Sequence, residues 1–86
     1  MFFEWDALKS ASNKLKHGIS FEEVEEALAK EAPLDAFRNA NYPGQEVWVF
    51  RSLEGKICSV AVEQRGGKVR FISAHQNRKM RKMYGS

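Results

Sequence analysis

Residues 3–23, FEWDALKSASNKLKHGISFEE, predict two consecutive helices with a start signal before each and a glycine between them. Asp6 can cap the first helix, because its carboxylate can accept hydrogen bonds from backbone N–H groups of the first turn. Gly18 suits the end of that helix, since glycine readily adopts the left-handed conformation found there. Ser20, followed three residues later by Glu23, has the pattern of a capping box and opens the second helix.

The apolar residues of both helices recur at three- and four-residue spacing, which places each set on one face of its helix. The two sets are Leu8, Ala11 and Leu15 in the first helix, and Phe21, Val24, Ala27 and Leu28 in the second. We expect both faces to pack in the core. The first helix runs to about His17, and the second ends before Pro33.

Segments with strand character lie on both sides of the helical pair. Residues 1–5 predict a short strand, whereas residues 33–44, rich in Asn, Pro and Gly, are expected to be irregular. Three later segments alternate apolar and polar residues and are joined by short turns, as in antiparallel hairpins. These strands cover residues 45–53, 56–63 and 68–74, and a basic helix over 77–84 follows them. The order β-α-α-β-β-β-α is typical of an α+β fold, with helices packed against a small antiparallel sheet.

The faces of the strands follow from the same alternation. We interpret Trp5, Trp48 and Phe50 as core residues rather than platforms for stacking RNA bases. In the last strand, strict alternation places Phe71 and Ala74 on opposite faces.

The composition of the chain fits one small globular domain. Its 86 residues are 43% hydrophobic and 29% charged, which allows one modest core, so we assign residues 1–86 to a single domain. No segment approaches the roughly 20 apolar residues of a membrane helix, and the N-terminus lacks the pattern of a secretory signal. The lone Cys58 cannot form an internal disulfide, and we interpret it as a buried thiol. These features predict a cytoplasmic protein that does not associate with membranes.

The charge is distributed unevenly along the chain. The net charge is +3, and all 11 acidic residues lie between Glu4 and Glu63. The stretch from Gln64 to Ser86 contains Lys and Arg but no acid. A basic end on a small domain indicates a polyanionic partner, either a nucleic acid or an acidic protein.

Several kinds of chemistry have no support in the sequence. The histidines, His17 and His75, and the single cysteine do not have the spacing of metal ligands, so neither a metal nor a cofactor is predicted. Gly66-Gly67 belongs to a hairpin turn rather than to a phosphate-binding loop. Ser59 and Ser73 lie in the middle of strands, which suits packing better than nucleophilic attack.

Metal-free RNA cleavage remains open, because RNA carries its own nucleophile in the 2′-hydroxyl. The protein must then move protons, which His or a carboxylate can do near neutral pH, and stabilise phosphate charge with Arg or Lys. The candidates are Lys14, Lys16, His17, Glu46, Arg51, Arg65, Arg70 and His75. Lys14 and Lys16 project about 200° apart on a helix, so they are not expected to face the same site.

Each candidate also has a structural interpretation. His17 could interact with the last carbonyls of its helix, and Arg65 could be a solvent-facing charge beside a turn. Arg51 and Arg70 could line a basic face of the sheet or form ion pairs with strand glutamates. Glu46 could act as a base, but a carboxylate in this position is more often only a charge at the start of a strand.

The N-terminal pattern resembles the opening of the BrnT family of toxins from type II toxin–antitoxin systems. The residues that carry the resemblance are Phe3 to Asp6, Lys9, Asn13 and Lys16 to Glu23. Later segments are also similar, namely Arg51-Ser52, Gly55-Lys56, Glu63, Arg65-Gly66 and Val69 to Ala74. The resemblance covers nearly the whole chain apart from residues 33–44.

This resemblance implies a fold similar to RelE-type ribonucleases, metal-independent RNA cleavage and inhibition of translation. It also implies a BrnA-like antitoxin with a ribbon-helix-helix region, through which the complex would bind DNA. Carried over by position, the active-site residues would be His17, Arg51, Arg65 and Arg70. Lys14 and Lys16 would then be supporting cations, and Arg81 also fits the family pattern. Together with His75, which follows a predicted strand at a place suitable for an acid, they are the candidates for binding RNA phosphates.

The C-terminal segment departs from the family pattern. Members usually have Arg at the position of His75 and Glu near Met80, and the stretch from Ala74 to Tyr84 is about one residue shorter here. These departures leave reduced cleavage as an alternative. They also leave open a second hypothesis, a non-catalytic basic module that binds an acidic antitoxin or nucleic acid within a repressor complex.

Overall fold

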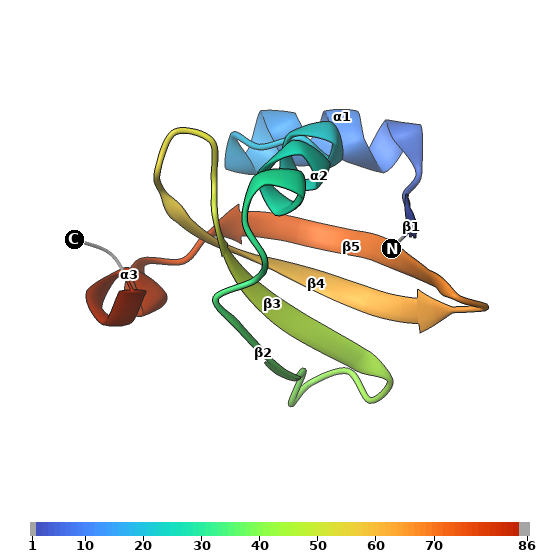
Figure 1. Cartoon of the computed structure of the whole chain (residues 1–86). Helices are drawn as coiled ribbons and strands as arrows, with labels where there is room; N and C mark the ends of the chain where they lie inside the picture. The colour runs from blue at the N-terminus through green and yellow to red at the C-terminus, as the bar shows by residue number, and fades with distance from the viewer. Residues whose placement is uncertain (1, 85–86) are drawn as a thin grey trace.

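The computed structural model of the chain describes residues 2–84, which form one five-stranded sheet and three helices (Figure 1). The elements are β1 (Phe2–Glu4), α1 (Ala7–His17), α2 (Phe21–Lys30), β2 (Asp35–Arg38), β3 (Gln45–Arg51), β4 (Ile57–Arg65), β5 (Lys68–Gln76) and α3 (Arg78–Tyr84). The sheet has the strand order β1-β5-β4-β3-β2. The α+β class is therefore confirmed.

Two features of the sheet differ from the prediction. The stretch expected to be irregular contains β2, which pairs antiparallel with β3 as an edge strand. Its sequence, DAFR, has no alternating apolar pattern because most of its residues are exposed. In addition, β1 pairs parallel with β5, so the sheet is mixed. A parallel pair needs a long connection between its strands, and the intervening helices and strands supply one.

The helix signals in the N-terminal stretch are confirmed. The carboxylate of Asp6 accepts hydrogen bonds from two backbone N–H groups of α1, and Gly18 ends this helix with φ +78°. Ser20 and Glu23 form the complete capping box of α2. Both helices therefore begin where their capping residues predict.

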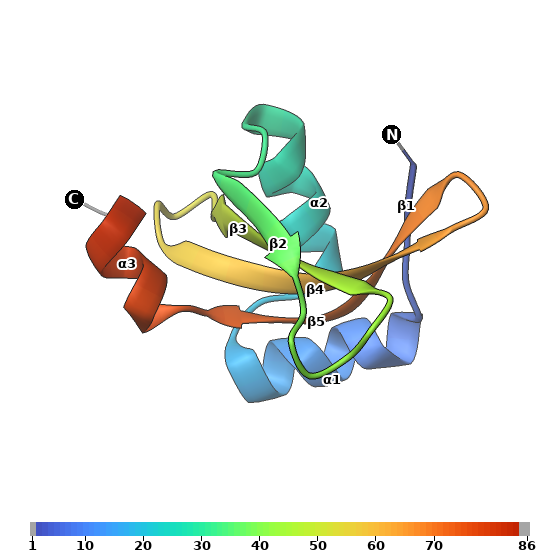
Figure 2. The same cartoon turned by 90° about the horizontal axis from the view of Figure 1, so that it is seen from below.

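Helices α1 and α2 lie over the same face of the sheet, and Figure 2 shows α1 running beside β5. The core lies between α2 and the sheet, where Phe21 packs with Trp48, Phe50 and Phe71. Trp5, half-buried, stacks on Phe71 with ring centroids 5.6 Å apart. The interpretation of Trp5, Trp48 and Phe50 as core residues is therefore confirmed.

The prediction for the buried face of α1 is wrong. Leu8 and Leu15 are 82% and 88% exposed, whereas Ser10 and Asn13 are buried. Ser10 Oγ accepts a hydrogen bond from the backbone N–H of Phe21 at 2.9 Å and donates one to the carboxylate of Glu22. Helix α1 thus docks through polar groups, because the first turn of α2 presents unpaired N–H groups that need an acceptor.

Asn13 joins α1 to the edge of β5. Its Nδ2 donates to the carbonyls of Ala74 and Ile19, at 2.8 and 2.7 Å. Its Oδ1 accepts from the backbone N–H of Ala74 at 3.2 Å. The parallel strand β1 pairs only with Lys68 to Arg70, so it leaves this part of β5 without a neighbouring strand. The Asn13 amide satisfies both backbone groups of Ala74 in its place.

A bulge in β5 changes which residues face the core. Ser73 pairs with Ala61 and Phe71 pairs with Val62, so Ile72 is an extra residue between them. The expected opposite placement of Phe71 and Ala74 is therefore wrong, and both lie in the core. An extra residue shifts the alternation by one position, as β-bulges do.

Helix α3 covers one end of the opposite face of the sheet, which we call the outer face (Figure 1). Asn77, just before α3, donates a hydrogen bond from Nδ2 to Ser59 Oγ at 3.1 Å. At the end of the helix, the Tyr84 hydroxyl donates to Asp35 at 2.8 Å. The rest of the outer face is left open.

Replacing Asn13 with Ala should destabilise the protein by about 3 kcal/mol, because it leaves three buried backbone groups without partners. Urea unfolding followed by circular dichroism measures this change. Leu15→Ala is the matched control in the same helix and should change stability by less than about 0.5 kcal/mol, since Leu15 is exposed. The polar docking of α1 would be contradicted if the Leu15 variant were the less stable of the two.

Candidate active site

The two histidines of the chain lie side by side at the end of β5. The centroids of the His17 and His75 rings are 6.1 Å apart, and the rings are tilted by 53°. Asn13 explains this proximity, because His17 follows it by one helical turn and His75 follows Ala74 directly. The contact that docks α1 therefore also brings together two side chains that are far apart in sequence. Both imidazoles reach solvent.

The surroundings of His75 favour its neutral form. Partial burial lowers the pKa of His75, and the nearby charge of His17 lowers it further. A histidine with a lowered pKa is largely neutral at physiological pH, and a neutral imidazole can accept a proton. His75 lies within β5 rather than after it as predicted, and pairs with Ser59 across the sheet.

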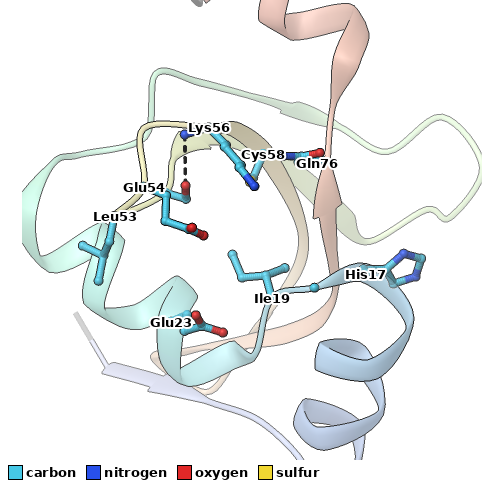
Figure 3. A pocket seen from close by; sticks show the side chains of 10 residues that line it. His17, Ile19, Glu23, Leu53, Glu54, Lys56, Cys58 and Gln76 are labelled. Atoms are coloured by element: carbon cyan, nitrogen blue, oxygen red, sulfur yellow. Dashed lines mark hydrogen bonds between the residues drawn. The ribbon is translucent and has the colours of Figure 1, made fainter.

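A small pocket of about 140 Å³ lies beside His17, between the ends of α1 and β5 and the loop that joins β3 to β4 (Figure 3). His17 forms part of its rim, with the imidazole directed away from the centre. Lys56, from the loop before β4, and Cys58, from β4 itself, also line the pocket. Burial raises the pKa of Cys58 to about 11, so this thiol stays protonated and is a poor nucleophile.

Glu23, which also lines this pocket, has a structural role. Its carboxylate accepts hydrogen bonds from Lys14 Nζ and from the backbone N–H of Ser20, both at 2.8 Å. The hydrogen bond from Lys14 is the main reason that the pKa of Glu23 is lowered. Glu23 is therefore ionised, and its carboxylate is already hydrogen-bonded within the capping box of α2.

A neighbouring pocket of about 380 Å³ is lined by cations. Its lining residues are Gly55, Lys56, Ile57, Gln76, Asn77, Arg78 and Arg81, with no acidic residue among them. This pocket shares Lys56 and Gln76 with the smaller pocket that His17 borders, so the two pockets adjoin. Lys and Arg side chains are the usual partners of phosphate oxygens. The pocket is thus suited to an anion such as an RNA phosphate.

Lys14 and Lys16 point in different directions, as their helical spacing predicts. Lys14 forms an ion pair with Glu23 of α2. Lys16 lines a shallow hollow together with His17 and Ser73. Of the two lysines, Lys16 is therefore the one that shares a pocket with His17.

Arg65 and Arg70 lie at the other end of the β4–β5 hairpin. Arg65 pairs with Glu63 at 2.9 Å, and Arg70 pairs with Glu4 at 3.2 Å. At about 3.3 Å per strand residue, they lie about 15–25 Å from His75 along the sheet. Both are on the outer face, as His75 is. Their cross-strand pairs, Glu63 with Arg70 and Arg65 with Lys68, alternate along the hairpin with pairs that face the core.

Arg51 and Glu46 have partners elsewhere in the structure. Arg51 forms an ion pair with Glu31 at 3.5 Å and donates to the carbonyl of Tyr84. Glu46 accepts a hydrogen bond from Trp48 Nε1 at 2.9 Å. Of the four residues predicted to form the active site, only His17 belongs to the histidine pair. Arg51, Arg65 and Arg70 lie on three different strands of the sheet.

Sequence reasoning missed Lys56 and Arg78 as candidates for phosphate binding. Lys56 follows a turn, and Arg78 begins a helix rich in basic residues, so neither stands out from its neighbours. Only the folding of the β3–β4 loop against the start of α3 brings the two together. A pattern along the chain does not reveal this contact.

Comparison with known families gives one match over most of the chain. A family model described as "Ribonuclease toxin, BrnT, of type II toxin-antitoxin system" matches residues 5–82. No curated protein matches the chain. Within residues 2–84, no helix is long and apolar enough to cross a membrane.

Proton NMR titration of the two imidazoles tests the electrostatic coupling in the site. His75 should titrate below the ordinary histidine value of 6.5. His17→Gln should raise the pKa of His75, because it removes a nearby positive charge that opposes protonation. The pKa should stay below its ordinary value, since burial still disfavours the charged form. An unchanged or lower pKa in this variant would contradict the coupling.

Proposed function

Because the chain belongs to the BrnT family of ribonuclease toxins of type II toxin–antitoxin systems, we propose that it is a metal-independent endoribonuclease. It cleaves RNA by attack of the 2′-hydroxyl on the adjacent phosphate, and this cleavage inhibits translation. The observation that carries the proposal is the proximity of His17 and His75 beside a pocket lined by cations. Two groups that exchange protons and a phosphate-binding surface are what this reaction requires.

His75 acts as the general base, since its lowered pKa keeps the imidazole neutral at physiological pH, and only the neutral form can accept a proton. It removes the proton of the 2′-hydroxyl, and the 2′-oxygen forms a bond to phosphorus. Protonated His17 donates its proton to the 5′-oxygen as the bond between that oxygen and phosphorus breaks. The products are a 2′,3′-cyclic phosphate and a 5′-hydroxyl. The proton gained by one histidine balances the proton lost by the other.

The cations stabilise the negative charge that develops on the phosphate oxygens. Lys56, Arg78 and Arg81 line the pocket next to His75 and hold the reacting phosphate, while Lys16 supports it from the side of His17. The more distant cations hold other phosphates of an RNA strand lying across the outer face. These are Arg51, Arg65 and Arg70, each of which would exchange its carboxylate partner for RNA.

The partners follow from the family. A BrnA-like antitoxin with a ribbon-helix-helix region would neutralise the toxin, and the complex would contact DNA through the antitoxin. The protein would act in the cytoplasm, where its RNA substrate is. No cofactor takes part in the proposed reaction.

His17→Gln and His75→Gln should each lower the rate of RNA cleavage by about 100-fold or more, because each removes a proton-transfer group. Gel analysis of a labelled RNA oligonucleotide in EDTA measures the rate. Lys30→Gln, a change of an exposed cation away from the histidines, is the control and should leave the rate unchanged. A 2′-deoxy substitution at the cleaved nucleotide should abolish cleavage at that position.

Three results would count against this mechanism. Cleavage that stops in EDTA would exclude metal independence, and cleavage that survives the 2′-deoxy substitution would exclude the 2′-hydroxyl as nucleophile. Full activity in the double variant His17→Gln/His75→Gln would exclude the histidine pair. If the unaltered protein leaves RNA intact and its expression leaves growth unaffected, the non-catalytic binding module is the better description.

A further inference from the structure

A broad groove lies on the helical side of the molecule, between the end of α2 and strands β1, β2 and β3. Its volume is about 900 Å³, and none of its lining residues belongs to the pockets around His17 and His75. The lining residues are Phe3, Glu25, Glu26, Leu28, Ala29, Ala32, Pro33, Ala36, Glu46 and Trp48. The mechanism above uses none of them.

The floor and walls of the groove are apolar. Trp48 is buried at its base, and Phe3 and Leu28 are half-buried beside it. The small side chains of Ala29, Ala32 and Ala36 are exposed along its walls and leave room for side chains from another molecule. A continuous apolar hollow of this size on a small protein marks a surface for binding.

The rim of the groove is acidic. Glu25, Glu26 and Glu46 are its charged residues, and none of them forms an ion pair within residues 2–84. The carboxylate of Glu46 instead accepts the hydrogen bond of the Trp48 indole. Although the protein has a net charge of +3, all the charged residues that line the groove are therefore negative.

Another exposed apolar surface, on α1, lies among positive rather than negative charges. Leu8 and Leu15 project from α1 with Lys9, Lys14 and Lys16 nearby in the sequence. The two apolar surfaces therefore differ in the partner that each would select. Electrostatic complementarity favours a basic partner at the groove and opposes one at the basic helix.

We propose that this groove binds a helical segment of a protein partner whose apolar face is flanked by Lys and Arg. Apolar side chains of the segment fill the hollow over Trp48, and its cations pair with Glu25, Glu26 and Glu46. The link to the antitoxin rests on the proposed function. A partner that binds DNA needs basic residues to contact phosphates, and the acidic groove accommodates such residues where the basic C-terminal region would repel them.

The groove and the histidine pair have separate linings, so occupation of the groove does not by itself fill the RNA site. A partner that docks in the groove could therefore be retained while other parts of it cover the histidines. Two contacts on one partner strengthen each other through the high effective concentration of the second. The groove would then contribute affinity, while the covering segment would block cleavage.

The test uses two synthetic helical peptides of about 14 residues, or about four turns. Both carry Leu at the same helical spacing, and all other positions are Lys in one peptide and Glu in the other. Binding to the ¹⁵N-labelled protein is followed by the backbone amide signals of Ala29, Ala32 and Ala36. The Leu/Lys peptide should shift these signals in a saturable manner, and the Leu/Glu peptide should not.

A charge-reversed groove provides the second arm of the test. Glu25→Lys/Glu26→Lys changes two exposed residues and should weaken binding of the Leu/Lys peptide at least about tenfold. Single Glu25→Lys should weaken it more than Glu54→Lys, which makes the same charge change outside the groove. The double variant should retain the RNA cleavage of the unaltered protein, because neither residue lies at the histidine pair.

The proposal is overturned if the Leu/Lys peptide leaves the groove signals in place or shifts mainly those of Leu8 and Leu15. Equal binding of the Leu/Glu peptide in the groove would overturn it as well, as would unchanged affinity in Glu25→Lys/Glu26→Lys. If the unaltered protein binds the Leu/Lys peptide in the groove but does not cleave RNA, the result would instead count against the proposed mechanism. The failures of the two proposals are therefore distinguishable.

Discussion

The hydrogen bonds between the Asn13 amide and the backbone of Ala74 dock helix α1 against strand β5. Strand β1 ends before it reaches this part of β5, and one side chain from α1 pairs with the exposed N–H and C=O groups. A buried backbone group without a partner is costly, so this contact has few substitutes. The position of α1, and with it the position of His17 beside His75, depends on it.

Polar docking of α1 also determines which surfaces remain available for partners. Ser10 and Asn13 face inward, so Leu8 and Leu15 face solvent next to lysines. Helix α2 carries most of its apolar residues into the core and leaves glutamates along the large groove. The cations of α3 gather at the other side, beside the histidines. The molecule thus separates a basic surface suited to RNA from an acidic groove suited to a basic protein.

Prediction from sequence succeeded where the signal is local and failed where a distant contact overrides it. Asp6, Gly18 and Ser20 marked the helix ends correctly, because capping depends on groups within one turn. The prediction that Leu8 and Leu15 face the core was wrong, because helical spacing shows that residues share a face but not which face meets the core. The pairing of β2 with β3 was also missed, because an exposed edge strand has little apolar pattern.

The sequence by itself determined the family, the α+β class, the helix boundaries and the basic C-terminal region, all of which follow from residues close together along the chain. Tertiary structure alone decided which candidates meet. It placed His17 against His75, added Lys56 and Arg78 beside them, and separated Arg65 and Arg70 from them along the hairpin. The physical reason is that strand register, the bulge at Ile72 and the Asn13 contact join residues that no spacing along the chain relates.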